Sequence, residues 1–272
     1  MKIAFGVVIY NQAVQWMDEF IESINKQLYC DFDLVIINDG VNEKDIYRFK
    51  QLKNKTLILN SPNYSTMSYN RVLLIKTAIV NEYDLLIFGD FDDTFSDNRV
   101  SEIVDNMDDK YTFYYNKLVC NNNQVFNSIP YEISNISDIL QYNFLGMSNT
   151  AINLHNISTD WLDTLVDVRT NIFDWYFYSR LLIDGFLGKY IKDCYTEYRQ
   201  SDNNIAGIQI NSNAELIKEY KVKQYHYSLL KSRCLKILKL YNIYNSFDES
   251  QIPNKYLEHE RNGFWWEKII VK

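Results

Sequence analysis

The chain has 272 residues, 47% of them hydrophobic and 23% charged, a globular composition that excludes a disordered or fibrous chain. No apolar run approaches the roughly 20 residues of a bilayer span, and no signal-peptide pattern opens the chain, so we expect a cytoplasmic protein. The net charge of −7 divides into −12 for residues 1–215 and +5 for residues 216–272, and the acidic body excludes nucleic acid as a partner because nucleic acid needs a positive surface.

Over the first 90 residues, short apolar runs alternate with helical patterns. We expect buried strands at residues 3–11, 34–37, 56–60 and 84–89, and helices at residues 13–28, 42–53 and 68–80. This alternation predicts an α/β fold with a mostly parallel central sheet and helices on both of its faces. Ligands of such sheets bind beyond the carboxyl ends of the strands, where Asn11, Asn38 and Asp39, and the acidic residues 90–93 are expected.

Beyond residue 98 the pattern is less regular. We expect helices at residues 98–107, 174–183 and 214–242, and strands at residues 111–119, 144–154 and 190–198. The last helical stretch is basic, and its lysines are interleaved with leucines and tyrosines. Such a helix can lie on an anionic membrane face, or it can pack its apolar side on its own domain with the lysines in solvent. Both arrangements are compatible with the sequence.

The segment Gly89-Asp90-Phe91-Asp92-Asp93 is the strongest candidate for a functional site. Side chains two residues apart in an extended segment point the same way, so Asp90 and Asp92 can face one ligand together. Mg²⁺ or Mn²⁺ is typically bound by one or two carboxylates plus the phosphates of a substrate. The alternative is a solvated acidic loop, but the apolar strand directly before the cluster favours a ligand site.

Six short segments in a fixed order point to a known family. They are Val8-Ile9-Tyr10-Asn11, Ile37-Asn38-Asp39-Gly40, Asn70-Arg71, Phe88-Gly89-Asp90-Phe91-Asp92-Asp93, Phe173-Asp174-Trp175 and Tyr198-Arg199-Gln200-Ser201-Asp202-Asn203-Asn204-Ile205-Ala206-Gly207. With them, residues 1–207 resemble the family 2 glycosyltransferases of the bacterial polysaccharide type, which have the GT-A nucleotide-sugar fold. The resemblance implies a GT-A domain at residues 1–210, and we expect residues 211–272 to form a basic helical extension packed on it.

The resemblance also implies an activity. It is the metal-dependent transfer of a hexose, with inversion, from a nucleotide-diphosphate donor (a UDP-sugar is favoured) to a hydroxyl of a glycan or lipid-linked glycan. The implied cofactor is Mn²⁺ or Mg²⁺, bound in an Asp-x-Asp motif. The implied process is cell-surface polysaccharide synthesis, with possible peripheral contact with the cytoplasmic face of the inner membrane.

The family's functional residues fall on matching positions of this chain. The implied nucleotide-binding residues are Tyr10, Asn11, Asp39, Asn70, Arg71 and Asp90, the implied metal ligands are Asp90, Asp92 and Asp93, and the implied general base is Asp174. A base is needed because a sugar hydroxyl is a poor nucleophile until its proton is removed. Two simpler readings remain open: Asp39 as a turn residue of Asn-Asp-Gly, and Asp174 as a helix cap.

Two positions depart from the family pattern. Ser201 stands where the family often has a metal-binding histidine, and Phe173 stands where it often has a second acid before the base. With Ser201, we expect the cation to depend on Asp92, diphosphate and water, with Asp202 or Asn204 as further candidates. These departures leave an alternative from another class, a non-catalytic nucleotide-sugar-binding or scaffold protein of the same fold.

Overall fold

The central feature is one large sheet. The structure is a computed structural model that describes residues 1–200, 212–246 and 262–270, and within these residues ten strands join in the order β3-β2-β1-β4-β9-β6-β10-β5, with β7 on β6 and β8 on β10. The strands are β1 (Ile3–Tyr10), β2 (Asp33–Asp39), β3 (Thr56–Asn60), β4 (Leu85–Asp90), β5 (Thr94–Phe95), β6 (Phe113–Cys120), β7 (Asn123–Gln124), β8 (Glu132–Ile133), β9 (Thr150–Asn153) and β10 (Gly188–Glu197).

The sheet is mostly parallel, as predicted. β1 lies between β2 and β4 and is parallel to both, and β2 is parallel to β3. β9 enters between β4 and β6 in the antiparallel direction, whereas β10 runs parallel to β6. The carboxyl ends of β1, β2 and β4 therefore lie side by side at one edge of the sheet.

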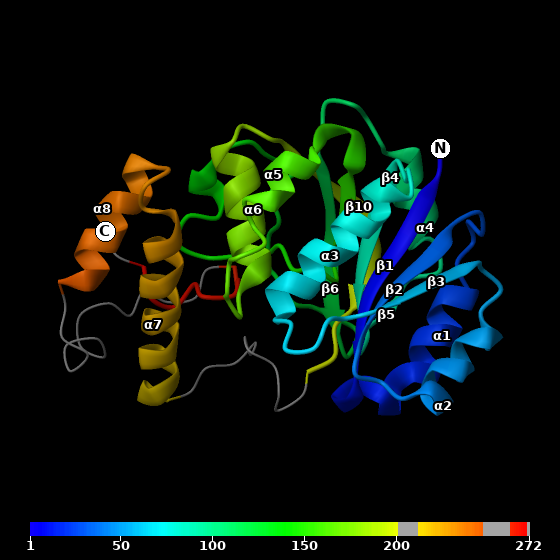
Figure 1. Ribbon diagram of the computed structural model, residues 1–272. Helices are drawn as coiled ribbons and strands as arrows, with labels where there is room; N and C mark the ends of the chain where they lie inside the picture. The colour runs from blue at the N-terminus through cyan, green and yellow to red at the C-terminus, as the bar shows by residue number, and fades with distance from the viewer. Residues whose placement is uncertain (201–211, 247–261, 271–272) are drawn as a thin grey trace.

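Helices cover both faces of the sheet (Figure 1). The helices are α1 (Met17–Asn25), α2 (Glu43–Ile46), α3 (Met67–Val80), α4 (Arg99–Asp105), α5 (Thr159–Asp163), α6 (Phe173–Ile183), α7 (Asn213–Leu230) and α8 (Leu235–Asn245). Side chains of β1 alternate between two cores: Phe5 and Val7 pack with α1 and α4, while Ala4 and Val8 pack with α3. Burial on both faces explains why these strands have uninterrupted apolar sequences.

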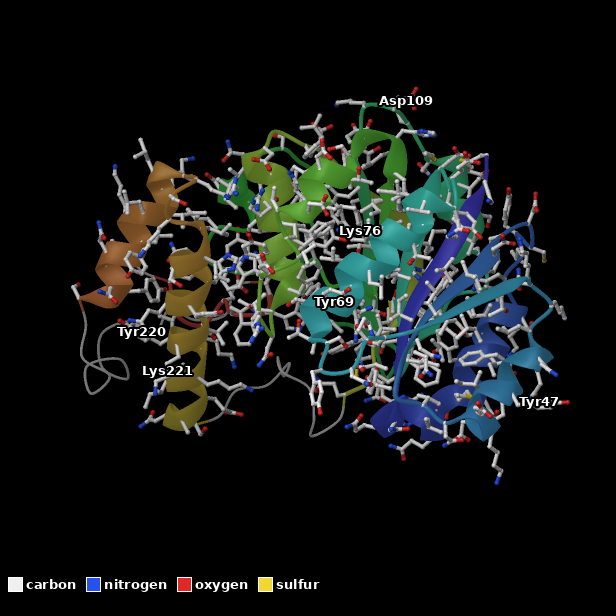
Figure 2. The ribbon with its side chains drawn as sticks, viewed as in Figure 1. Tyr47, Tyr69, Lys76, Asp109, Tyr220 and Lys221 are labelled. Carbon is white, nitrogen blue, oxygen red and sulfur yellow. The ribbon has the colours of Figure 1, made fainter. Side chains whose placement is uncertain are left out.

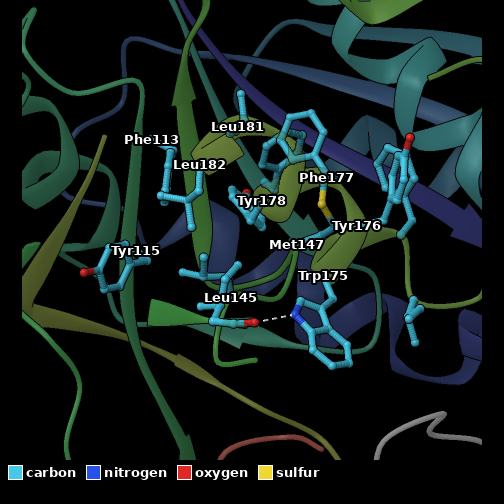
Figure 3. Close-up of a cluster of buried hydrophobic side chains, with 14 of the residues drawn as sticks. Phe113, Tyr115, Leu145, Met147, Trp175, Tyr176, Phe177, Tyr178, Leu181 and Leu182 are labelled. Atoms are coloured by element: carbon cyan, nitrogen blue, oxygen red, sulfur yellow. Dashed lines mark hydrogen bonds between the residues drawn. The ribbon is translucent and has the colours of Figure 1, made fainter. Parts of the chain in front are cut away.

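α6 is buried on almost every side. Figure 3 shows its aromatic side chains packed against Leu145, Met147 and Phe113 of β6, and the indole Nε1 of Trp175 donates a hydrogen bond to the carbonyl oxygen of Ile139 at 2.8 Å. A helix enclosed in this way has little freedom to shift. Its first turn is therefore a rigid place for a functional side chain.

The basic stretch predicted as one helix over residues 214–242 is divided between α7 and α8. Tyr220 of α7 lies against α8, where its ring is 5.1 Å from that of Tyr244, while Lys221 is exposed (Figure 2). Tyr227 and Ile237 belong to the same buried cluster as Phe113 of β6, so the apolar side of this pair of helices faces the protein. A domain boundary at residue 210 stays a prediction.

Further elements differ from the sequence-based expectation. The strand expected at residues 144–154 is limited to β9, because residues 144–149 form a loop held by the side chain of Asn149. Its Oδ1 accepts a hydrogen bond from the backbone N of Gly146 at 2.7 Å, and its Nδ2 donates to the carbonyl oxygen of Asn116 at 2.9 Å. The short helix α5 has no counterpart among the predicted elements. In the described part of the chain, no helix is long and apolar enough to cross a membrane.

Candidate active site

A cleft of about 520 Å³ lies beyond the carboxyl ends of β1, β2 and β4. Seven of the predicted site residues line it: Tyr10, Asp39, Arg71, Asp90, Asp92, Asp93 and Asp174. Asn11 and Asn70 are not among its lining residues. The position is the one expected for a ligand of a parallel α/β sheet.

The acidic segment after β4 is a turn rather than an extended strand. β4 ends at Asp90, and the backbone N of Asp93 donates to the carbonyl oxygen of Asp90 at 3.2 Å. Phe91 is fully buried, with its ring 5.5 Å from that of Phe20, and anchors the turn. The prediction that an extended backbone makes Asp90 and Asp92 point the same way is therefore wrong, yet both side chains line the cleft.

The three carboxylates of this turn have different partners. Asp90 forms an ion pair with Nη2 of Arg71, and one oxygen of Asp93 accepts from the backbone N of Arg199 at 2.8 Å. The other oxygen of Asp93 is buried and has no hydrogen-bond partner among the described residues. Burial, and then the charge of Asp90, raises the pKa of Asp92 to about 6. Burial, followed by the charges of the neighbouring carboxylates, raises the pKa of Asp93 well above its usual value.

This crowding of carboxylates fits a bound cation, because Mg²⁺ and Mn²⁺ prefer oxygen ligands and would offset the mutual repulsion. Within the described ranges, no group of three His, Cys, Asp or Glu side chains is arranged to hold a metal ion. A cation at this turn would therefore need further oxygen atoms from a substrate. Ser201, Asp202 and Asn204 lie outside the described residues.

The end of β2 presents Asp39 to the cleft. The turn that follows is held by Asn38, whose Oδ1 accepts from the backbone N of Val41 at 2.8 Å. Gly40 has a φ of +87°, which glycine adopts without strain, and its carbonyl oxygen accepts from Nδ2 of Asn11 at 2.8 Å. Asn38 and Asn11 thus fix the loop, and the exposed carboxylate of Asp39 is left facing the cleft.

Asn70 and Arg71 lie in the first turns of α3, which is capped by Thr66. Asn70 is fully buried, and its Oδ1 accepts a hydrogen bond from Ser61 Oγ at 2.6 Å. It therefore fastens the loop after β3 instead of facing the cleft. Arg71, the next residue, reaches the cleft through its contact with Asp90.

Asp174 lies on the other side of the cleft, in the first turn of α6. The N-cap of this helix is Ile172, and Asp174 accepts a hydrogen bond from the backbone N of Trp175 at 2.8 Å. Burial raises the pKa of Asp174 to about 7, with a smaller contribution from the charge of Asp90. A carboxylate with a pKa near neutrality can take up a proton at physiological pH.

Several residues of the cleft were not predicted. Trp16, Ser148, Trp265 and Trp266 all line it. Ser148 Oγ accepts from the backbone N of Asp90 at 3.2 Å and so supports the acidic turn. The adjacent tryptophans were visible in the sequence as an uncommon pair among only five tryptophans, but nothing in their spacing connects them with the first 200 residues.

Comparisons with known proteins agree with this geometry. The family described as Glycosyl transferase family 2 matches residues 5–161. The crystal structure of S. aureus TarS 1-349 has 16% identity and a TM-score of 0.62, with 94% of this chain and 75% of TarS 1-349 covered. The mannosyltransferase PcManGT from Pyrobaculum calidifontis, solved with GDP-Man and Mn²⁺, has 11% identity and a TM-score of 0.56, with 90% and 69% covered.

GalNAc-T7, solved with UDP, GalNAc and Mn²⁺, has 10% identity and a TM-score of 0.54, with 94% of this chain and 56% of GalNAc-T7 covered. No curated protein matches the chain. Likeness at such low identity shows the fold alone, and it confirms the predicted GT-A architecture.

Proposed function

The chain belongs to glycosyl transferase family 2, and we propose that it is an inverting glycosyltransferase that moves a hexose from a nucleotide-diphosphate donor to a hydroxyl of a glycan or lipid-linked glycan. The observation that carries the proposal is that one cleft is lined by Asp39, by the acidic turn after β4, and by Asp174. These groups provide for the three needs of the reaction, which are nucleoside binding, diphosphate binding and removal of a proton.

On the donor side, we assign the nucleoside to Tyr10 and Asp39 and the ribose and diphosphate to Arg71 and Asp90. The assignment is supported by the positions of these residues at neighbouring strand ends and at the start of α3. Asn11 and Asn70 would act indirectly, by holding the loops that carry their neighbours. A UDP-sugar is the favoured donor, since TarS 1-349 has been solved with UDP-GlcNAc and with UDP.

Asp92, with Asp90 and Asp93, would hold Mn²⁺ or Mg²⁺. When bound, such an ion stabilises the negative charge that develops on a leaving diphosphate. Arg71 supplies a fixed positive charge beside the same turn, because its guanidinium contacts Asp90. Both features make departure of the diphosphate easier.

On the acceptor side, Asp174 would act as the general base. The acceptor oxygen forms a bond to the anomeric carbon while the bond from that carbon to the diphosphate oxygen breaks. The hydroxyl proton passes to the carboxylate of Asp174, and the nucleoside diphosphate leaves with the bonding electrons. Attack from the face opposite the leaving group inverts the anomeric configuration.

The cellular setting that we propose is cell-surface polysaccharide synthesis on the cytoplasmic face of the inner membrane. Exposed basic side chains of the C-terminal helices, such as Lys221, support peripheral contact with an anionic membrane.

Calorimetric titration with UDP, GDP and dTDP, each with and without Mn²⁺, tests the proposal. We expect one nucleotide to bind, and to bind more tightly with Mn²⁺. Failure of all three to show metal-dependent binding would contradict a metal-dependent transferase. Donor binding without turnover on any acceptor would favour the alternative, a non-catalytic nucleotide-sugar-binding protein.

A further inference from the structure

The C-terminal segment, residues 262–270, forms part of the cleft. Trp265 is bridged to the core, because its carbonyl oxygen accepts from the backbone N of Asn143 at 2.9 Å. Its ring packs over Gly146, where an added Cβ would lie 3.0 Å from Cη2, and stands 5.9 Å from the ring of Tyr198. Trp265 and Trp266 are 8% and 6% exposed, and both line the cleft. A segment far beyond the family match at residues 5–161 thus completes the site.

Trp266 has an uncommon backbone conformation. Its φ is +64°, in the left-handed region that a bulky side chain rarely adopts. The conformation is held by Glu267, whose Oε2 accepts from the backbone N of Asn262 at 3.0 Å and of Phe264 at 3.1 Å. Such strain persists only where the surroundings enforce it, and it is concentrated at functional sites. Here it accompanies an indole ring that lines the cleft beside a tryptophan neighbour.

Helix α7 supports both this segment and the proposed base. Ile269 is held at both backbone groups: its N donates to Oε1 of Glu219 at 2.8 Å, and its carbonyl oxygen accepts from Nζ of Lys223. Three residues further along α7, the ring of His226 stacks on the ring of Trp175, with centroids 4.1 Å apart. Trp175 is the residue directly after Asp174 in the chain. In Figure 1 the segment lies between α6 and α7, and its later residues reach α7. The tryptophans and Asp174 are therefore positioned by the same helix, on the side of the cleft away from β1 and β2.

We propose that Trp265 and Trp266 form a sugar-binding subsite that takes a pyranose ring of the acceptor glycan; this inference rests on the proposed function. The apolar C–H face of a pyranose suits an aromatic wall, while its hydroxyls suit the polar groups around it. The acceptor is favoured over the donor sugar because a general base must lie within hydrogen-bond reach of the acceptor hydroxyl, and Asp174 shares its support with the two tryptophans. Asp39 and Tyr10, assigned to the donor, belong to the opposite side.

Saturation-transfer-difference NMR with methyl glycosides of glucose, galactose, mannose and N-acetylglucosamine tests the proposal. Each sample contains the protein, Mg²⁺ in place of the paramagnetic Mn²⁺, and whichever of UDP, GDP or dTDP binds, so that nucleotide and sugar signals are recorded from the same sample. We compare the wild type with Trp266→Ala and with Trp266→Gly, which removes the ring but suits the left-handed φ. Trp161→Ala is the matched control, because Trp161 packs on Phe177 and Phe186 and does not line the cleft.

We expect pyranose signals with the wild type and with Trp161→Ala, and signals at least about fivefold weaker with both Trp266 variants, while the nucleotide signals stay constant. Nucleotide signals without any pyranose signal from the wild type, or pyranose signals that persist in both Trp266 variants, would overturn the proposal. A third outcome would also overturn the proposal: both Trp266 variants bind the glycosides as the wild type does, but their affinity for UDP-GlcNAc falls relative to their affinity for UDP. Trp266 would then hold the donor sugar. Absence of nucleotide signals from the wild type would count against the proposed function instead.

Discussion

The two sides of the cleft are held in place by different interactions. On the side of Asp39 and Asp90, the backbone does the positioning: Tyr10 of β1 is paired with Asp39 of β2, and Val8 is paired with Asp90 of β4. On the side of Asp174 and Trp266, three buried side chains of α7 position the neighbouring segments. They are Glu219 and Lys223, which bond the backbone of Ile269, and His226, which stacks on Trp175.

This difference separates function from stability. A strand ladder shares the positioning among many hydrogen bonds, so an acidic side chain at its end can change with little effect on folding. A buried ion pair depends on both partners, since removal of one leaves an uncompensated charge in the interior. Substitutions on the first side should therefore affect binding, and those on the second should affect catalysis or folding.

The largest effect is expected from Asp174→Asn. The variant keeps the size of the side chain and an oxygen that can accept from the backbone N of Trp175, but it cannot take up the acceptor proton. Transfer should fall by about 10²–10⁴ while donor affinity is retained. Coupled detection of the released nucleoside diphosphate gives the rate, and calorimetry gives the affinity. The control is Asp163→Asn, which changes an exposed residue that pairs with Lys76 outside the cleft and should keep its turnover. If Asp174→Asn kept more than about a tenth of the wild-type turnover, the base would lie elsewhere.

Lys223→Met tests the buried pair. Both partners are fully buried, so the variant leaves the Glu219 carboxylate without a counter-ion, and the free energy of unfolding should fall by about 3–5 kcal/mol. In the double variant Glu219→Gln with Lys223→Met, the charge is gone and an acceptor for Ile269 remains, so most of the loss should be recovered. Urea unfolding measures each value. Equal stability of the single and double variants would show that the pair does not carry this side of the cleft.

Asp92→Asn should separate metal binding from folding. Loss of one carboxylate from the turn should weaken the Mn²⁺-dependent part of nucleotide binding by at least about tenfold, with an unchanged far-UV circular dichroism spectrum. Isothermal calorimetry with and without Mn²⁺ is the measurement. Normal metal-dependent binding by the variant would make Asp92 a turn residue only.

Asp39→Ala should have a smaller effect. It removes a single hydrogen-bond acceptor from the nucleoside, worth about 0.5–1.5 kcal/mol or about 2–12-fold in affinity. The ratio of affinities with and without Mn²⁺ should stay the same, because Asp39 lies at the end of β2 and not in the acidic turn. A changed ratio would show that the two groups are not independent.

A separate effect is expected on thermal stability as a function of pH. Asp174 has a pKa of about 7 in the folded protein, against about 3.9 for an ordinary aspartate, so its contribution to stability is complete below pH 4 and is lost as the pH rises through 7. The melting temperature of Asp174→Asn relative to the wild type should therefore increase between pH 4 and pH 8. A constant difference over this range would mean that the carboxyl group titrates normally in the folded chain.

The side of the cleft that the strand ladder builds was the more predictable from sequence. Apolar runs fix the strands, and polar residues directly after them, such as Asp39 and Asp90, must lie at the sheet edge whatever the details of packing. What this reasoning could not provide is the local geometry: the turn at residues 91–92 depends on burial of Phe91 among Phe20 and Phe49.

The other side was predicted only at Asp174, through a motif. Trp265 and Trp266 reach the cleft because buried groups of α7 hold Ile269, and no periodicity along the chain encodes such a contact. The loop at residues 144–149 was expected as a strand for a related reason, since its apolar sequence gives no sign of the hydrogen bonds that the Asn149 side chain accepts from Gly146 and donates to Asn116.

The path of the C-terminal segment also sets an order of events during translation. Strands β1 to β4, Asp39 and the acidic turn are all synthesised within the first 93 residues, so the donor side of the cleft can form before translation is complete. The tryptophan side needs α7 and then residues 262–270, which leave the ribosome later. A nascent chain that has left the ribosome only up to residue 246 would contain Asp39, Asp90 and Asp174 but not Trp265 and Trp266. Such an intermediate could bind nucleotide before it could select an acceptor.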